Sequence, residues 1–436
     1  SPRFLDVRAR FDAEKDVTPQ EYAAAAKLLG RAPEEVKLRD VEVRVLLQPG
    51  HAPQAERHVA AAKNAIKWFG LWYGRYPYPT LTVVDPAPGG GGSGGMEYPT
   101  FITAGTSFLM NRWPFDKVLA PEEVTVHEFG HQYWQSMVAS NEFEESWLDE
   151  GFNTYSTAKA MERSYGPWTA QFPLGLRVGE LETSLMQNGR DRAFDAVRTS
   201  AWGYSPGNYS FNSYGRTKLT LDTLESILGE ETMARAMRTY HERFRFRHPS
   251  SDDFYATVSE VAGRDVRWFF DQTVERPGIV DYEVASVRSE RVAEPRGILG
   301  DGPSPKTVGE REASKIEREK DASGAGRPYR TTVIVRRRGE VSGLPLRLRL
   351  SWEGGGHEDV ALEDAPGQAW TGRWKKVERT GQKRLVSATV DPDGTLVLDV
   401  NRLDDARRTR PDGRAAAAWG TRLIFWIQQA LALAGM

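Results

Sequence analysis

The segment PEEVTVHEFGHQYWQSMVAS, residues 121–140, decides the fold class of this chain. A proline and two glutamates open it, as is typical of the first turn of a helix. On that predicted helix His127 and His131 are four residues apart, so both imidazoles project from one face and can hold one metal ion. Glu128 stands beside this pair, where it can reach a metal-bound water. An ordinary helix with two exposed histidines is the alternative interpretation of this pattern alone.

A second predicted helix, residues 146–165, supplies the third ligand. It contains Glu150, and eighteen residues separate Glu150 from His131. That length accommodates a helix end, a loop and a return, so Glu150 is expected to face the two imidazoles. Two histidines and one carboxylate leave a fourth coordination position open, which is the pattern of a catalytic zinc site. Alone, Glu150 could be a carboxylate that complements the helix dipole; together with the histidines it predicts one bound Zn²⁺ ion.

The composition narrows the classes of function. The chain has 436 residues, of which 39% are hydrophobic and 27% charged, a globular composition. Its net charge is −2, which disfavours nucleic-acid binding as a main function. It contains no cysteine, so disulfides, thiolate catalysis and cysteine-ligated metal sites are excluded. Any metal must therefore be held by His, Asp or Glu.

The pattern along the chain predicts a multidomain α+β protein. Residues 41–48 alternate apolar and polar side chains as a strand does, whereas residues 121–278 are mostly helical in character. Residues 283–328 contain no aromatic side chain and are rich in Gly, Pro and charge, which is typical of solvated chain. After them, short alternating segments with turn signals between them indicate a small β-sandwich.

Three motifs resemble those of one enzyme family. HEFGH, followed after eighteen residues by the glutamate of WLDEG, is similar to the zinc site of the gluzincin aminopeptidases, the family of aminopeptidase N and the leukotriene hydrolase. Residues 94–98, GGMEY, look like the G-x-M-E-N strand that precedes the zinc helix in that family. Tyr214, in SYGRTKLTLDTLESILGEE, looks like the family's tyrosine before a helix. The resemblance covers residues 41–278.

The resemblance implies a role for each matching residue. Glu128 is the general base, which takes a proton from the zinc-activated water and passes it to the leaving amine. Tyr214 stabilises the oxyanion, and Glu97 pairs with the free α-ammonium of the substrate, which makes the enzyme an exopeptidase. The zinc ligands are His127, His131 and Glu150. The substrate-binding residues are Gly94, Gly95, Met96, Glu97 and Tyr98.

The resemblance also implies a division of the chain. The expected fold is a thermolysin-like zinc metallopeptidase domain with a helical subdomain, followed by a small β-sandwich. The expected parts are the remnant or end of an N-terminal β-region (1–50), the catalytic domain with its helical part (51–285), a flexible linker or long loop (286–328), the β-sandwich (329–402) and an apolar C-terminal helix (403–436).

Three departures from the family pattern bear on substrate binding. Tyr98 stands where the family usually has Asn, which is expected to reshape the first substrate pocket. Asp149 stands where Asn is usual before the ligand glutamate, which adds a negative charge beside the zinc. The family's large N-terminal β-domain would precede about Val41, so we expect either a fragment or a short form with an open cleft.

The predicted function is a zinc-dependent aminopeptidase acting on peptides with a free N-terminus. Within the enzyme class, a zinc endopeptidase or a non-peptide hydrolase on the same site is the alternative. From another class, the chain could be a scaffold or interaction protein that keeps the fold. Because the three ligands and the base are all present, the enzyme is favoured over the scaffold.

The C-terminal segment, residues 415–436, is apolar except for a few polar side chains. Two interpretations stay open: a helix packed on the body of the protein, or a helix at a membrane surface or partner, with Trp419, Phe425 and Trp426 at the interface. The tail favours a membrane-associated or exported protein over a cytoplasmic one.

Overall fold

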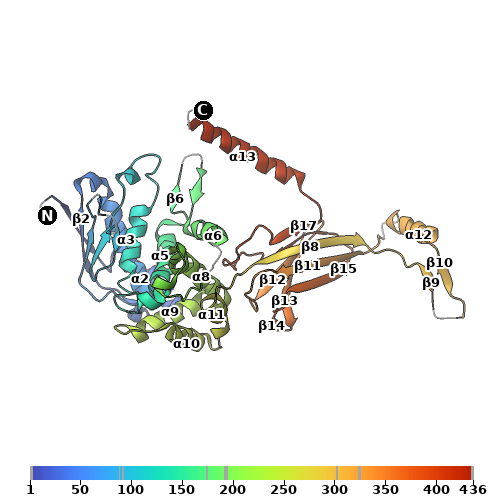
Figure 1. Cartoon of the computed structure of the whole chain (residues 1–436), viewed down its shortest axis with the longest axis horizontal. Helices are drawn as coiled ribbons and strands as arrows, with labels where there is room; N and C mark the ends of the chain where they lie inside the picture. Colours follow the sequence, from blue (N-terminus) through green and yellow to red (C-terminus); the bar gives the residue numbers. More distant parts are fainter. Residues whose placement is uncertain are drawn as a thin grey trace. The chain divides into compact units, whose positions relative to one another are not determined.

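A computed structural model of the chain describes residues 3–87, 89–90, 93–172, 175–190, 195–300, 303–322 and 326–433. They form two units, which Figure 1 shows with their helices and strands labelled. The first unit comprises Ser1–Val280 together with Thr395–Val400. The second comprises Asp281–Gly394 together with Asn401–Met436.

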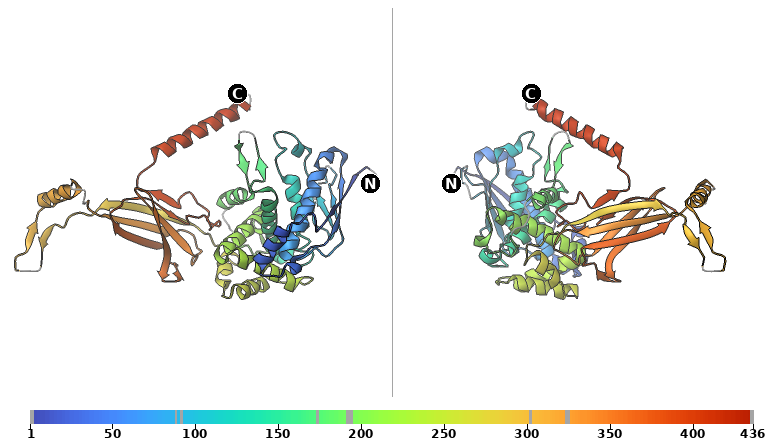
Figure 2. Two further views of the ribbon diagram at one scale, coloured as in Figure 1. Left: turned by 180° about the vertical axis from the view of Figure 1, so that it is seen from behind. Right: turned by 45° about the vertical axis from the view of Figure 1, so that its right-hand side comes forward.

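A five-stranded mixed sheet forms one side of the first unit (Figure 2). Its strands are β1 (Leu5–Phe11), β2 (Val41–Leu47), β3 (Thr80–Val84), β4 (Gly95–Met96) and β5 (Phe101–Ala104). Their order is β1-β2-β3-β5-β4. β2, β3 and β5 run parallel to one another, whereas β1 and β4 are antiparallel to their neighbours. β4 therefore forms one edge of this sheet.

Helices fill the rest of the first unit. The longest, α2 (Ala55–Tyr73), packs on α3 (Ala120–Gly130), which in turn contacts α5 (Glu150–Tyr165). Aromatic side chains such as Phe69, Phe129 and Tyr133 interlock between these helices and are fully buried. The other helices of the unit are α1 (Pro19–Leu29), α4 (Glu142–Glu145), α6 (Glu180–Arg190), α7 (Asn208–Ser210), α8 (Thr217–Leu228), α9 (Glu230–Phe244), α10 (Ser251–Ala262) and α11 (Arg267–Thr273).

The N-terminal fifty residues, predicted to be the remnant or end of an N-terminal β-region, contribute two strands to the sheet of the first unit. β1 and β2 pair over their whole lengths and join the mixed sheet of the first unit through β3. Between them lies α1, which the sequence analysis did not predict. Its start is fixed by a capping box of Thr18 and Glu21, and its end by Gly30, which has a left-handed φ of 61°.

Two larger sheets form the sandwich of the second unit. The three-stranded sheet has the order β15-β11-β8 and the larger one β14-β13-β12-β16-β17. β16 and β8 contact each other, and alternate residues such as Leu348 and Val333 are buried, as in a sandwich. The strands are β8 (Tyr282–Arg291), β11 (Tyr329–Arg337), β12 (Leu346–Trp352), β13 (His357–Ala365), β14 (Gln368–Ala369), β15 (Trp374–Gly381), β16 (Leu385–Val390) and β17 (Ala406–Arg408).

Residues 286–328 are predicted to be a flexible linker or long loop, but the described residues of this range include regular elements. They hold the end of β8, a hairpin of β9 (Gly297–Leu299) and β10 (Lys306–Val308), and helix α12 (Glu310–Ala322). The charges that suggested solvated chain are paired across these elements, for example Lys320 with Glu294 at 2.7 Å. Ala313 of α12 is fully buried. The sandwich also begins earlier than predicted, since β8 pairs with β11.

The C-terminal helix α13 (Gly413–Leu433) carries large apolar side chains that are exposed, including Trp419 and Phe425. Among the described residues, no helix combines the length and the apolarity needed to cross a bilayer. Both interpretations of this helix, packing on the body of the protein and contact with a membrane surface or a partner, stay predictions.

Candidate metal centre

The two histidines of the HEFGH motif lie at the C-terminal end of α3. His127 belongs to the last turn of the helix and His131 is the residue that caps it. Their ring centroids are 4.9 Å apart and the ring planes are nearly perpendicular, at 88°. The spacing of four residues thus brings both imidazoles to one side of the helix, where each directs its Nε2 atom at the same point.

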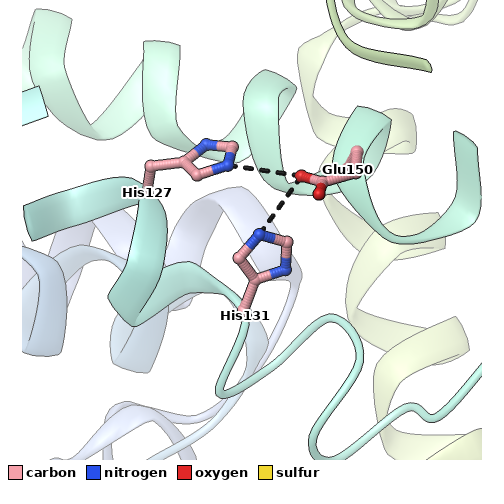
Figure 3. Close-up of side chains that lie close together, drawn as sticks. All are labelled: His127, His131 and Glu150. Atoms are coloured by element: carbon pink, nitrogen blue, oxygen red, sulfur yellow. Dashed lines mark ion pairs between the residues drawn. The ribbon is translucent and has the colours of Figure 1, made fainter. Parts of the chain in front are cut away.

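Glu150, the first residue of α5, completes this group (Figure 3). Its Oε2 atom lies 3.3 Å from Nε2 of His127 and 3.2 Å from Nε2 of His131. The three candidate ligand atoms are within 4.8 Å of one another. Burial would raise the pKa of Glu150, but the two imidazoles hold it below its ordinary value, so the carboxylate is ionised as a ligand must be.

These residues fit a divalent ion such as zinc. Oε2 of Glu150 is buried and has no hydrogen-bond partner within the described part of the chain. A buried carboxylate oxygen in that situation is costly unless a cation or a proton satisfies it. Two imidazole nitrogens and one carboxylate oxygen are a ligand set that zinc favours, and they leave room for a fourth ligand.

A buried carboxylate orients one of the candidate ligands. Oδ1 of Asp149 lies 2.7 Å from Nδ1 of His131, and the Asp149 side chain is 0% exposed. Its charge raises the pKa of His131 against the effect of burial, and the bond places the Nδ1 proton toward Asp149. Nε2 of His131 is then the atom that is free to bind the metal. The negative charge of Asp149 beside the metal could be predicted from the sequence, whereas its hydrogen bond with His131 could not.

Asn153, one turn after Glu150, connects α5 back to α3. Its Nδ2 atom donates a hydrogen bond of 2.7 Å to the backbone carbonyl of His127. The helices can approach this closely because residue 130 is glycine: a Cβ atom on Gly130 would lie 1.8 Å from Oδ1 of Asn153. Asn153 is thus a positioning residue that sequence reasoning missed, although it lies on the same face of the predicted helix as Glu150.

Glu128 lies beside the candidate ligands and is only 6% exposed. Burial raises its pKa to about 7, an effect that the two imidazoles oppose and the Glu97 carboxylate reinforces. A carboxylate with such a pKa can both accept and release a proton near neutral pH. Gly95 of β4 lies directly against it, since a Cβ atom on Gly95 would be 2.3 Å from Oε1 of Glu128. A side chain at this position of the strand would therefore displace the Glu128 carboxylate.

The GGMEY segment is held against the zinc-motif helix by one buried amide. Gln132, which is 0% exposed, donates to the backbone carbonyls of Glu97 and Tyr98, at 3.2 Å each. Its Oε1 atom accepts a hydrogen bond of 2.8 Å from the backbone N–H of Thr100. Sequence reasoning missed Gln132, although it directly follows the second histidine. Tyr98 is 53% exposed, so its ring is available to a ligand.

The backbone of the same segment pairs on one side only. Gly95 and Met96 pair with β5, and the backbone N–H of Gly105 donates to the carbonyl of Gly94 at 2.6 Å. Because β4 is the last strand in the order of the sheet, its other side faces no strand among the described residues. An extended peptide could add to this edge.

Tyr214 lies on the other side of His127, in a π-helical segment, Phe211–Arg216, that leads into α8. Its ring stacks on that of His127, with centroids 5.9 Å apart and planes at 21°. Burial and the nearby charge of Glu150 raise the pKa of Tyr214 far above its ordinary value. The phenol is therefore protonated and can donate a hydrogen bond.

A cavity of about 670 Å³ opens beside these groups. Its walls come from α3, α5, α6 and the segment around Tyr214. Its charged and aromatic polar lining consists of Glu123, His127, Glu128, Glu180 and Tyr214, and Thr154, Thr157, Thr169, Thr183 and Ser210 add hydroxyl groups.

An HExxH helix whose two imidazoles meet a glutamate from a later helix, beside a mixed sheet, defines the class of gluzincin metallopeptidases. The comparison with protein families agrees: residues 58–273 match the Peptidase family M1 domain, so this part of the chain carries that family's domain. The family predicted from the sequence is therefore confirmed.

Known relatives are aminopeptidases. Probable aminopeptidase 1 of Sulfurisphaera tokodaii is 23% identical over 59% of this chain, and Aminopeptidase N of Lactococcus lactis is 27% identical over 37% of it. The chain spans only 33% and 19% of these two relatives. A crystal structure of Legionella pneumophila aminopeptidase A in complex with aspartic acid has a TM-score of 0.56 at 14% identity, and the match covers 89% of this chain and 37% of that one. This structural similarity supports the mixed α+β fold of the chain.

Proposed function

We propose that this chain carries the catalytic part of a zinc-dependent aminopeptidase, with a thermolysin-like sheet-and-helix part and a helical part. The observation that carries the proposal is the convergence of His127, His131 and Glu150 within 4.8 Å, with Glu128 beside them. A zinc ion held by these three residues would polarise the scissile carbonyl and make a water acidic enough to attack it. The substrates would be peptides with a free N-terminus.

Glu128 acts as the general base in this proposal. A pKa near 7 lets its carboxylate take the proton of the attacking water and return it to the leaving amine. Its buried position beside Gly95 keeps bulk water from competing for that proton. Since Glu128 contributes no atom to the three-ligand set, its role in proton transfer can be separated experimentally from metal binding.

Tyr214 stabilises the negative charge that develops on the carbonyl oxygen. Its raised pKa keeps the phenol protonated, and its stacking on the His127 ring holds it next to the centre. A donor that is fixed before the reaction stabilises the transition state more than the ground state.

Glu97 binds the α-ammonium group of the substrate. Its backbone carbonyl accepts a hydrogen bond from Gln132, which supports a fixed position for this residue at the end of β4. The unpaired side of β4 offers backbone groups to the first residue of an extended peptide. A fixed carboxylate at this point favours cleavage after one residue over cleavage within a chain.

A panel of fluorogenic aminoacyl substrates, with and without a chelator, tests this function. We expect turnover that the chelator abolishes and that added zinc restores. One short peptide with a free or an acetylated N-terminus then separates an aminopeptidase from an endopeptidase. Equal cleavage of both forms would contradict the role of Glu97, and the absence of any hydrolysis by the zinc-loaded chain would contradict the enzyme.

A further inference from the structure

The cavity beside the metal centre has an acidic wall, of which the proposed reaction uses only Glu128. Glu123 of α3 and Glu180 of α6 are half-buried and line it together with Glu128, which is 6% exposed and accepts no hydrogen bond within the described part of the chain. No lysine or arginine is among the described residues that line this cavity. The cavity therefore favours a cationic group over an anionic one.

Glu123 is available to a ligand, unlike its neighbour in the sequence. Glu122 is buried and bound by Arg57, with a distance of 2.6 Å between Oε2 and Nη2. The carboxylate of Glu123 has neither a hydrogen bond nor an ion pair within the described ranges, and it lies one helical turn before His127. Burial raises the pKa of Glu123 to about 7, and the charge of Glu180 adds to that rise. A cation bound near the two carboxylates would offset the cost of burying the Glu123 charge and the repulsion between Glu123 and Glu180.

The position of the cavity fixes which part of a peptide would reach it. None of residues 94–98, which hold the amino end in the proposed function, lines the cavity. Its lining instead includes Glu128 and Tyr214, the groups that act on the scissile bond in the proposed function. A peptide anchored at Glu97 and cleaved at the metal centre would thus direct the residue after the scissile bond into the cavity. About 670 Å³ is ample for a lysine or arginine side chain.

We propose that Glu123 and Glu180 make the enzyme selective for peptides with Lys or Arg directly after the scissile bond. This inference rests on the proposed aminopeptidase function and adds to it the preferred second residue of the substrate. The two carboxylates are specificity-determining residues: they hold the cationic side chain of the leaving portion and take no part in the proton transfers.

Three peptides that differ only in the second residue test the proposal: Leu-Lys-Gly-Gly, Leu-norleucine-Gly-Gly and Leu-Glu-Gly-Gly. With the zinc-loaded full chain, we expect kcat/KM for the lysine peptide to exceed that for the norleucine peptide about tenfold, and the glutamate peptide to be the poorest. In the double variant Glu123→Gln, Glu180→Gln, the ratio of lysine to norleucine should fall to within about twofold of one. Glu56→Gln, which removes an exposed carboxylate of α2 outside the cavity, should keep the ratio.

An unchanged ratio in the double variant would overturn the proposal. So would a preference for lysine in the first position over the second, tested with Lys-Leu-Gly-Gly, because the cavity would then hold the first side chain. If the zinc-loaded chain cleaves none of the peptides, the proposed function fails by itself. Calorimetric binding of the lysine and norleucine peptides to the Glu128→Gln chain still decides the inference: tighter binding of lysine supports it and equal binding overturns it.

Discussion

The metal centre and the substrate edge next to it are built in different ways. The centre lies on α3 and α5, and its ligands and their supports, Asp149 and Asn153, all come from one continuous segment. The edge strand β4 pairs with β5, and it and the residues after it also contact Glu128 and Gln132, which belong to another motif. The first region is therefore specified by local spacing, and the second by how the sheet meets the helix. We expect damage to the first to affect chemistry and metal binding, and damage to the second to affect mainly how the substrate binds.

The largest effect is expected from Glu128→Gln, which tests the centre. The variant keeps the size of the side chain but cannot accept the proton, so kcat should fall by about 10²–10⁴-fold. Zinc content, measured by elemental analysis, should stay at one ion per chain, because Glu128 is not a ligand. His131→Ala is the matched control, in which both zinc and activity should be lost. Loss of zinc in Glu128→Gln would contradict this division of roles.

Tyr214→Phe should have the next largest effect. The substitution removes one hydrogen-bond donor and leaves the ring that stacks on His127. Since the bond forms chiefly in the transition state, kcat should fall by about 10²–10³-fold with little change in KM. Steady-state kinetics on one aminoacyl substrate measure both. An unaltered kcat would remove Tyr214 from the mechanism.

Asp149→Asn tests whether the support of the centre acts on the metal. The amide oxygen can still accept a hydrogen bond from the Nδ1–H of His131, but it lacks the negative charge that makes the imidazole a stronger ligand. Zinc affinity, measured by competition with a chelator, should weaken by about tenfold. The side chain is fully buried, so circular dichroism should accompany the titration to show that the fold is kept. Equal affinity would mean that Asp149 only orients the ring.

The same division explains what could be predicted from the sequence. The spacing of HEFGH and Glu150 predicts a three-ligand group, and the structure brings its atoms together because the geometry of two helices follows from local residues. Gln132 carries no such signal, since its partners at Glu97 and Tyr98 lie in another motif. Likewise, Glu180 reaches the cavity only because α6 packs against the Phe211–Arg216 segment, far from α3 in the sequence.

Outside the site, composition is a poor predictor of secondary structure where the charged side chains pair with one another. Residues 286–328 resemble solvated chain in composition, yet ion pairs such as Arg327 with Glu317, at 3.2 Å, accompany a regular helix. Helix α1 begins at a capping box and ends at one glycine. The short amphipathic pattern between them does not by itself predict a helix.

Gln132→Leu should have the smallest effect on chemistry and is the sharpest test of the substrate edge. The leucine fills a similar volume but leaves the N–H of Thr100 and the carbonyls of Glu97 and Tyr98 without their partner. A buried polar group without a partner costs about 1–3 kcal/mol, so the segment should shift toward water and carry Glu97 with it. KM for free-amine peptides should then rise about tenfold, while kcat and zinc content change little. If zinc is lost as well, the edge and the centre are one cooperative structure, and the distinction drawn between them is wrong.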